Sequence, residues 1–210
     1  MEESLKKLKI RFNEVQQERA RKTLEDILQA ADGIVEEGDE SAFDARTLAT
    51  RSGYALGSLI KRLGAIENVF LYAIAKARSR HLNEIAIQLK GLGTQVDCKE
   101  FCVALAKESI HRIRKINPAV IRFYEKKAMT RAASLDEVFC YTDEIIEPLM
   151  GLIDANETQS FRKLSRSEAK YVCRSMFVFV DRPFVEGDPM AGTKAHEIMI
   201  IENLLRMLRV

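Results

Sequence analysis

The feature that most constrains the fold is the spacing of apolar residues, which recur every three or four positions along most of the chain. This period places them on one face of each successive helix, and no stretch shows the alternating β-branched pattern of a strand. The sequence therefore predicts an all-α fold of about nine helices. Four prolines and ten glycines in 210 residues leave few positions that would interrupt a helix.

Capping signals set the expected helix boundaries. Gly38 ends the first well-defined helix, which carries apolar residues from Leu24 to Val35. Further helices are expected over 45–51, 55–63 and 65–90, then from Asp97, from Pro118, and from the capping boxes Ser134-Glu137 and Ser165-Glu168.

Two prolines are expected to interrupt the later helices. Pro148 should bend or break a helix that holds Cys140 and Met150, because proline lacks a backbone donor and clashes one turn back. Arg182-Pro183 should end a helix near 167–181, and a loop should separate it from a last helix near 191–208.

The two short helices over 45–51 and 55–63 are the most informative segment. Helices of about two turns are marginal alone, so they must pack against neighbours, as in a helix-turn-helix. Gly53 lies between them and permits the positive φ of a tight turn. The preceding stretch 23–44 contains acids and no Lys or Arg, whereas 45–65 contains four bases and no acid. Local positive charge of this kind suits phosphate binding, although a solvated surface would show the same charges.

The order of residues from 27 to 74 resembles the N-terminal domain of TetR-family transcriptional regulators. The segment reads ILQAADGIVEEGDESAFDARTLATRSGYALGSLIKRLGAIENVFLYAI. It has a first helix ending at Glu-Gly, an aromatic Phe43, an Arg-x-Leu-Ala helix, a glycine turn, a Gly-Ser-Leu recognition helix and a Glu-Asn-Val-Phe start to the next helix. The resemblance covers about a quarter of the chain, and the other helices agree in number, order and length.

The resemblance implies a three-helix DNA-binding domain over 1–65, with a basic N-terminal extension, and an effector-binding and dimerisation domain over 66–210. Double-stranded operator DNA and a small apolar or amphipathic effector are the implied partners, and the implied function is a repressor released from its operator. The residues implied to contact DNA are Arg46, Thr47, Leu56, Gly57, Ser58, Ile60, Lys61 and Arg62. Of these, Leu56, Ser58, Lys61 and Arg62 are expected to point outward from the second short helix.

The sequence departs from the family pattern inside the recognition helix. Ala55 stands where the family commonly has Ser or Thr, so the helix lacks its N-cap side chain. Ala65 and Ile66 replace a Ser-Lys pair, and Ile60, Arg62 and Leu63 stand where aromatic residues are common. These departures leave open a second interpretation, an interaction protein of the same fold that uses Leu56 and Ile60 to hold a protein partner.

The middle helices carry bulky side chains that are candidates for lining an effector cavity, expected around Pro148. They are Phe101, Phe123, Tyr124, Phe139, Met150 and Phe177. Most such residues form core, and methionine adapts to irregular ligands. For the dimer, Ile198, Ile201, Leu205 and Leu208 form a narrow apolar seam, which with the helix near 167–181 predicts a two-fold four-helix interface.

No chemistry-bearing motif points to an enzyme, a cofactor or a metal site. Cys98 and Cys102 are four residues apart on an expected helix, and nothing nearby supplies two further ligands in pattern, so buried thiols are the favoured interpretation. The net charge is only +2, and no apolar run is long enough to span a bilayer. We therefore expect a cytoplasmic protein without membrane contact.

Overall fold

The computed structural model describes residue 12 and residues 18–132 and 138–210. Within this part of the chain there are nine α-helices and two short 3-10 helices, and no strand longer than an isolated bridge between Phe161 and Arg209. The predicted all-α class and the predicted number of helices are confirmed. The described elements are α2 (Glu18–Glu37), η1 (Glu40–Ala42), α3 (Ala45–Ser52), α4 (Leu56–Leu63), α5 (Ile66–Lys90), α6 (Cys98–Ile113), α7 (Pro118–Met129), η2 (Cys140–Ile145), α9 (Ile146–Ala155), α10 (Arg166–Glu186) and α11 (Lys194–Leu208).

The chain packs as two units, and each unit combines two stretches that are separate in the sequence. The first contains residues up to 78 together with 116–138, and the second contains 79–115 together with 139–210. These packing units differ from the division at residue 65 that the sequence predicts on functional grounds, because α5 contributes turns to both units and α7 belongs to the first. The functional division itself stays a prediction.

Three aromatic rings form the centre of the first unit. Phe43 stacks on Phe70 of α5 with ring centroids 5.0 Å apart, and Phe123 of α7 meets Phe43 edge-on at the same distance. Lys127 on α7 also binds Glu67 on α5 at 2.6 Å, and this hydrogen bond is the main reason why the pKa of Glu67 lies below its usual range. These contacts join α5 and α7 to the segment that precedes α3.

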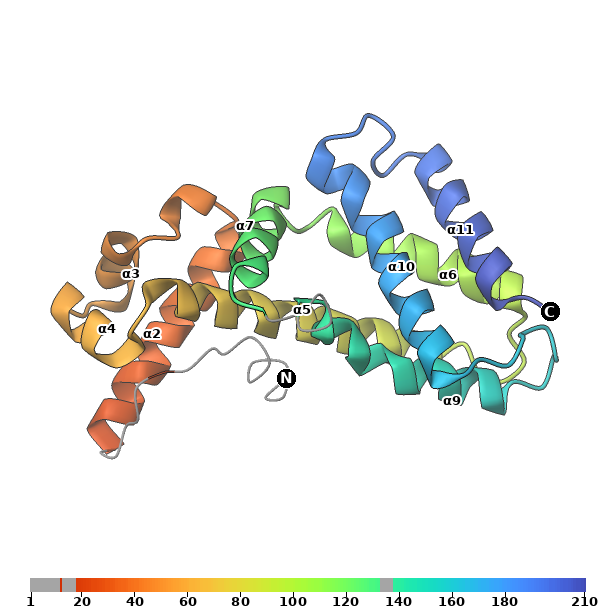
Figure 1. The fold of residues 1–210 in the computed structure, drawn as a ribbon, viewed down its shortest axis with the longest axis horizontal. Coiled ribbons are helices and arrows are strands. Elements are labelled where there is room, and N and C mark those ends of the chain that lie inside the picture. The colour runs from red at the N-terminus through yellow and green to blue at the C-terminus, as the bar shows by residue number, and fades with distance from the viewer. Residues whose placement is uncertain (1–11, 13–17, 133–137) are drawn as a thin grey trace. The chain divides into compact units, whose positions relative to one another are not determined.

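The second unit is a bundle of α6, η2, α9, α10, α11 and the last turns of α5, in which α10 and α11 run side by side (Figure 1). Its helices begin where the capping signals predict. Asp97 and Glu100 form one capping box at the start of α6, and Ser165 and Glu168 form another at the start of α10. The third predicted capping box, Ser134-Glu137, lies outside the described residues.

The helical stretch around Pro148 is interrupted as predicted, but the interruption comes just before the proline, which lies inside an α-helix. The segment 140–145 is a 3-10 helix, and the α-helical segment starts at Ile146. Pro148 is the third residue of α9, within the first turn, where backbone N–H groups have no intrahelical acceptor. The proline therefore fits the start of α9 without loss of a hydrogen bond.

The expectation that Arg182-Pro183 ends a helix is wrong, because α10 continues to Glu186 with Pro183 inside it. A proline at 183 cannot donate to the carbonyl of Phe179 one turn back. That carbonyl accepts a hydrogen bond from Nε2 of His196 on α11 instead, at 2.7 Å. Since a carbonyl only accepts, His196 carries its proton on Nε2, and its Nδ1 accepts from the backbone N–H of Gly192 at 2.9 Å.

His196 is fully buried and therefore supplies a structural link between α10, α11 and the turn that joins them. Its ring also lies 5.7 Å from that of Phe184. The last helix begins at Lys194 rather than near 191, and Thr193 caps it. None of the described helices combines the length and apolar character needed to cross a bilayer.

Replacing His196 with alanine should destabilise the protein by about 3 kcal/mol, because two partly buried backbone groups, the Phe179 carbonyl and the Gly192 N–H, lose their partner at a typical cost of about 1–3 kcal/mol each. In a Pro183→Ala background the new N–H of residue 183 can donate to Phe179, so the same substitution should cost about 1 kcal/mol less. Urea unfolding of the four proteins measures this coupling. Equal costs of His196→Ala in both backgrounds would contradict the compensation.

Candidate nucleic-acid interface and ligand cavity

The helix pair α3 and α4 has the geometry of a helix-turn-helix. Asp44 caps α3, and its carboxylate accepts from the backbone N–H groups of Arg46 and Thr47 at 2.7 and 3.2 Å and from the Thr47 hydroxyl at 2.6 Å. Gly53 ends α3 in the left-handed region at φ +72°, where its N–H donates to the carbonyl of Ala49. This residue makes the sharp turn between the two helices possible.

Contacts with α2 hold the pair in place. Arg51 at the end of α3 forms an ion pair with Glu37. The hydroxyl of Tyr54, in the turn, donates to the carboxylate of Asp26 on α2 at 2.6 Å. Two of the acids that precede α3 therefore orient the helix-turn-helix.

Packing decides which side of α4 faces outward. Leu59 and Leu63 are completely buried, as is Leu48 on α3. By contrast Leu56 is 40% exposed and Ile60 is 51% exposed. Gly57, Ser58 and Lys61 are also exposed, and together these residues form the outer face of α4: Leu56, Gly57, Ser58, Ile60 and Lys61.

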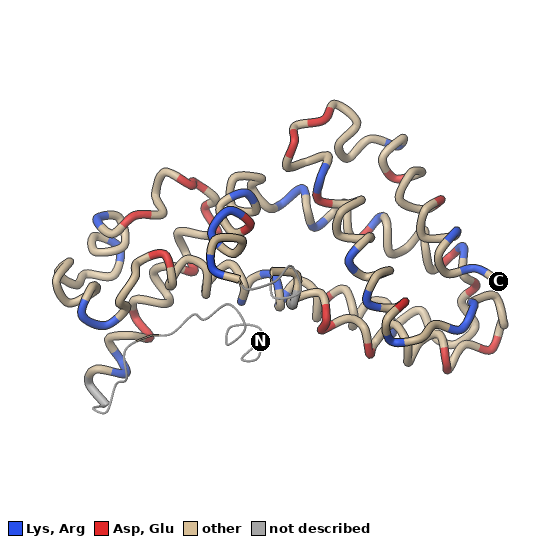
Figure 2. Tube along the Cα trace, viewed as in Figure 1, with Lys and Arg blue, Asp and Glu red and all other residues tan. Residues whose placement is uncertain are grey.

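The positive charge on the pair is concentrated on fewer residues than the sequence suggests. Arg46 and Lys61 are exposed, but Arg62 is half-buried and donates to the backbone carbonyl of Ala20 at 3.3 Å. The outward placement expected of Arg62 is therefore not seen, because its long side chain reaches back to α2. Figure 2 shows Lys and Arg on α3 and at the end of α4, and neither helix contains Asp or Glu.

The N-terminus of α4 has no side-chain cap, as the sequence predicts. Ala55 occupies the N-cap position with extended backbone angles, and no side chain accepts from the first amides. Ser58 and Leu59 donate to the Ala55 carbonyl, so the helix is closed from its third residue onward. The amides of Leu56 and Gly57 belong to the set that an N-cap side chain or an anion satisfies in other helices.

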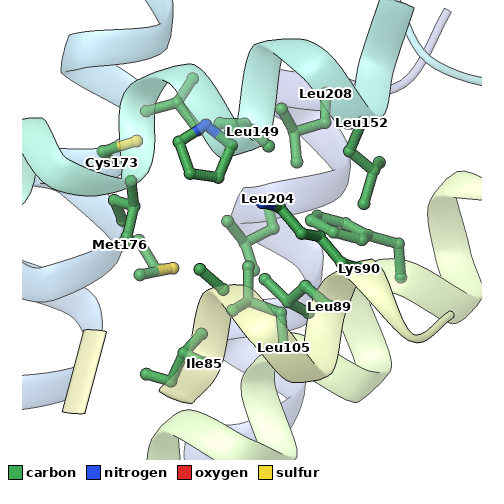
Figure 3. Close-up of a pocket in the computed structure, with 15 residues that line it drawn as sticks. Ile85, Leu89, Lys90, Leu105, Leu149, Leu152, Cys173, Met176, Leu204 and Leu208 are labelled. Atoms are coloured by element: carbon green, nitrogen blue, oxygen red, sulfur yellow. The ribbon is translucent and has the colours of Figure 1, made fainter. Parts of the chain in front are cut away.

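The second unit contains an apolar cavity of about 40 Å³. Figure 3 shows its lining residues and labels ten of them. The lining comes from five helices and η2: Ile85, Ala86, Leu89, Lys90, Phe101, Leu105, Ile145, Pro148, Leu149, Leu152, Val172, Cys173, Met176, Leu204 and Leu208. Among the lining residues that the structure describes, Lys90 at the end of α5 is the one with a charge. A cavity of this size holds about one water molecule and, being apolar, should be dry.

The structure separates the six aromatic and methionine residues proposed for the effector site. Phe101 lines the cavity, as does Pro148, around which the site was expected. Phe123 and Tyr124 are buried in the first unit instead. Phe139, Met150 and Phe177 belong to the second unit but are not among the residues that line this cavity.

Most lining residues were missed because nothing local distinguishes them. Leu89, Leu149, Leu152 and Leu204 follow the same apolar period as ordinary core residues, and a void depends on how side chains from different helices meet. Lys90 resembles any cation in the last turn of a helix. No pattern in the sequence would have singled it out.

Cys98, Cys102 and Cys173 are free and buried, as the sequence predicts for Cys98 and Cys102. These two lie on one face of α6, where a hydrogen bond between them lowers the pKa of Cys98 and raises that of Cys102. Burial raises the pKa of Cys173 to about 12. A neutral thiol is a poor metal ligand and nucleophile, so the buried Cys173 behaves as a small apolar side chain.

Asp44→Ala should destabilise the protein by about 1 kcal/mol, the usual cost of losing an N-cap side chain. Hydrogen bonds from the Thr47 hydroxyl first, and then from the Thr47 amide, hold the pKa of Asp44 below its usual value. The carboxylate therefore stabilises the folded state fully above its unfolded pKa of about 3.9, and this contribution disappears as the pH falls through the lower folded value.

Asp44→Asn is the matched control, because its amide oxygen still caps α3 but does not titrate. Urea unfolding from pH 7 to pH 3 should show the difference in stability between wild type and Asp44→Asn shrinking as the pH falls. A constant difference over this range would mean that Asp44 does not cap α3 as a carboxylate.

By sequence, no protein-family model and no curated protein matches the chain. By structure, the chain resembles a member of the TetR family from Streptomyces coelicolor A3, with a TM-score of 0.56, 16% identity, and coverage of 90% of this chain and 99% of the other.

Two further solved structures agree. A TetR transcriptional regulator from Rhodococcus sp. RHA1 matches with a TM-score of 0.58 and 14% identity, over 90% of this chain and 97% of the other. The multidrug binding protein EbrR, complexed with imidazole, matches with a TM-score of 0.59 and 15% identity, over 93% and 97%. The similarity extends over nearly the whole length of each structure and includes both units, which supports the resemblance first found in residues 27–74: the chain has the fold of the TetR-family transcriptional regulators.

Proposed function

We propose that the protein is a DNA-binding transcriptional regulator of the TetR type, in which α4 lies in the major groove. The observation that carries this proposal is the division of α4 into a buried side, Leu59 and Leu63, and an exposed outer face. An α-helix fits the major groove with one side toward the bases and the other toward its own domain. The absence of acidic residues from α3 and α4 leaves nothing on either helix to repel phosphates.

The outer face of α4 supplies both kinds of contact that DNA recognition requires. Lys61 and, on α3, Arg46 provide positive charge for phosphates, and Ser58 can donate to a phosphate or a base edge. Gly57 lets the backbone approach closely. Leu56 and Ile60 suit the methyl group of thymine, so the preferred operator should contain thymines where these side chains meet it.

Lys61→Ala should weaken DNA binding and flatten its dependence on salt. Each phosphate contact contributes close to one unit of slope in a plot of log affinity against log salt concentration. A dimer loses two such contacts, so the slope should become shallower by about two. Fluorescence anisotropy on DNA flanking the coding region measures it, with the exposed Lys107→Ala on α6 as the control, which should keep the wild-type slope. An unchanged slope in Lys61→Ala would remove α4 from the interface.

We further propose a homodimer formed through α10 and α11. Tyr171 and Val178, two turns apart on α10, are 64% and 45% exposed, and Ile198 on α11 is 45% exposed. Ile201 and Leu205 are half-buried and continue the line from Ile198 at the next turns. Leu208, expected in the same seam, is instead completely buried in its own unit together with Ile200 and Leu204. A two-fold dimer would present two α4 helices to successive major grooves about 34 Å apart.

Ile198→Glu should shift the protein from dimer to monomer, because a carboxylate buried against a second apolar helix has no partner. Ile87→Glu is the matched control, since Ile87 is an isoleucine on α5 that is 69% exposed in the monomer. Size-exclusion chromatography with light scattering reads the mass. If both variants remained dimeric, or if Ile87→Glu became monomeric, the dimer interface would not be formed by α10 and α11.

We also propose that the protein is a repressor that acts in the cytoplasm and is released from DNA by a small effector. The apolar cavity of the second unit is the proposed binding site of this effector. An effector regulates only if it binds the DNA-free conformation more tightly than the DNA-bound one. A coupling of about 1–3 kcal/mol, typical of allosteric proteins, changes operator affinity roughly 5- to 150-fold.

The second candidate function is a protein-interaction module on the same fold. Exposed Leu56 and Ile60, together with the missing cap at Ala55, favour it. Selection of binding sites from random duplex DNA separates the two, because a regulator enriches a near-palindromic sequence and an interaction module enriches none.

A further inference from the structure

The cavity of the second unit differs from an ordinary packing defect by its one charged neighbour. Fourteen of its fifteen lining residues are apolar, counting Cys173, and the fifteenth is Lys90. In Figure 3 the Lys90 side chain lies among the leucines that surround the cavity, near Leu89 and Leu204. No Asp or Glu is among the described residues that line this cavity.

Lys90 has no competing role within the described part of the chain. Its side chain forms no hydrogen bond or ion pair with the described residues. A lysine in the last turn of a helix often serves the terminal carbonyls, but here backbone amides do so. Gly91 donates to Ile87, Leu92 donates to Leu89, and Gly93 donates to the carbonyl of Lys90 itself, at 3.1–3.3 Å.

An open groove of about 520 Å³ adjoins the cavity and gives a head group access to Lys90. Cavity and groove share Lys90, Pro148 and Leu152, so these three residues stand between them. Of the described residues that line the groove, Glu147 is the only acid, and Arg166 already forms an ion pair with it. The positive charge of Lys90 is therefore not neutralised by its neighbours in the groove.

The distribution of charge selects one class of ligand. A cationic head would be repelled by Lys90, and Glu147 in the groove is already paired with Arg166. A neutral polar head would gain at most one donor from the ammonium. A carboxylate would gain a charge-assisted hydrogen bond, while its apolar part removes hydrocarbon surface from water at about 25 cal/mol per Å².

We propose that the site binds an amphipathic carboxylate, with an unbranched alkyl chain in the cavity and the carboxylate on Lys90. Its role as the effector rests on the proposed function; its binding does not. A cavity of about 40 Å³ is smaller than such a chain, so the lining side chains must move. Met176 and the half-buried Leu149 and Leu152 are suited to this, because methionine is unbranched and adaptable and the leucines border solvent.

The test compares probes that share one alkyl chain and differ in the head group. Calorimetric titration of the full chain at pH 7.4 with decanoate, decanol and decylamine should give decanoate about tenfold the affinity of the other two. Lys90→Met keeps the apolar stem and should abolish this preference while leaving decanol binding unchanged. The exposed Lys107→Met should behave as wild type.

A second pair of variants tests whether the chain enters the cavity. Ala86→Leu and Leu149→Phe add volume to its wall and should reduce binding of both decanoate and decanol at least tenfold, with folding checked by thermal melting. Ala86→Leu changes a buried position and Leu149→Phe changes a half-buried one, so the second is easier to accommodate and at least one of the two variants should fold. Equal affinity of wild type for decanoate and decanol, a preference for decanoate that survives Lys90→Met, or unchanged binding in a folded filling variant would each overturn the proposal.

The titrations contain no DNA, so their result does not depend on whether the protein binds an operator. A chain that binds decanoate through Lys90 but no operator would overturn the regulator and confirm the ligand class. A chain that binds an operator and shows no preference for decanoate would do the reverse.

Discussion

The burial of Leu59 and Leu63 is the constraint on which the proposed interface depends. A helix of eight residues without an N-cap side chain does not persist in water, so α4 exists because these two leucines are removed from solvent. Their burial also fixes the rotation of α4 about its axis. Every residue of the outer face is therefore exposed as a consequence of packing on the opposite side. Two acids of α2 also help to fix the position of the helix pair. Glu37 binds Arg51 at the end of α3, and Asp26 binds Tyr54 in the turn.

The sequence predicted what local chemistry decides. Caps at Asp97 and Ser165 were readable because each residue bonds to an amide within three positions of itself. The missing cap at Ala55 was readable for the same reason. Pro183 was misread because the partner that makes it tolerable inside α10 is His196, thirteen residues further along the chain and on another helix. A rule based on neighbouring residues cannot include that hydrogen bond.

The candidate sites show the same limit. Leu56, Ser58 and Lys61 were placed correctly on the outside of α4 by helical spacing, but Arg62 bonds to a carbonyl at residue 20 that spacing does not reveal. Phe101 lines the cavity, whereas Phe123 and Tyr124 belong to the other unit because the chain returns to it after α6. Composition identified the residue types of an effector site without saying which helices surround the void.

The small size of the cavity matters for regulation. If the cavity already had the shape of its ligand, the ligand would bind to the conformation seen here, stabilise it, and favour no other conformation. At about 40 Å³ it does not, so a ligand with an alkyl chain must bind a state in which Met176, Leu149 or Leu152 has moved. Those side chains lie on α9 and α10, and α10 is the helix on which the proposed dimer interface depends. A ligand that displaces them distinguishes between two packings of the second unit, and such a difference in affinity is the physical requirement for an effector.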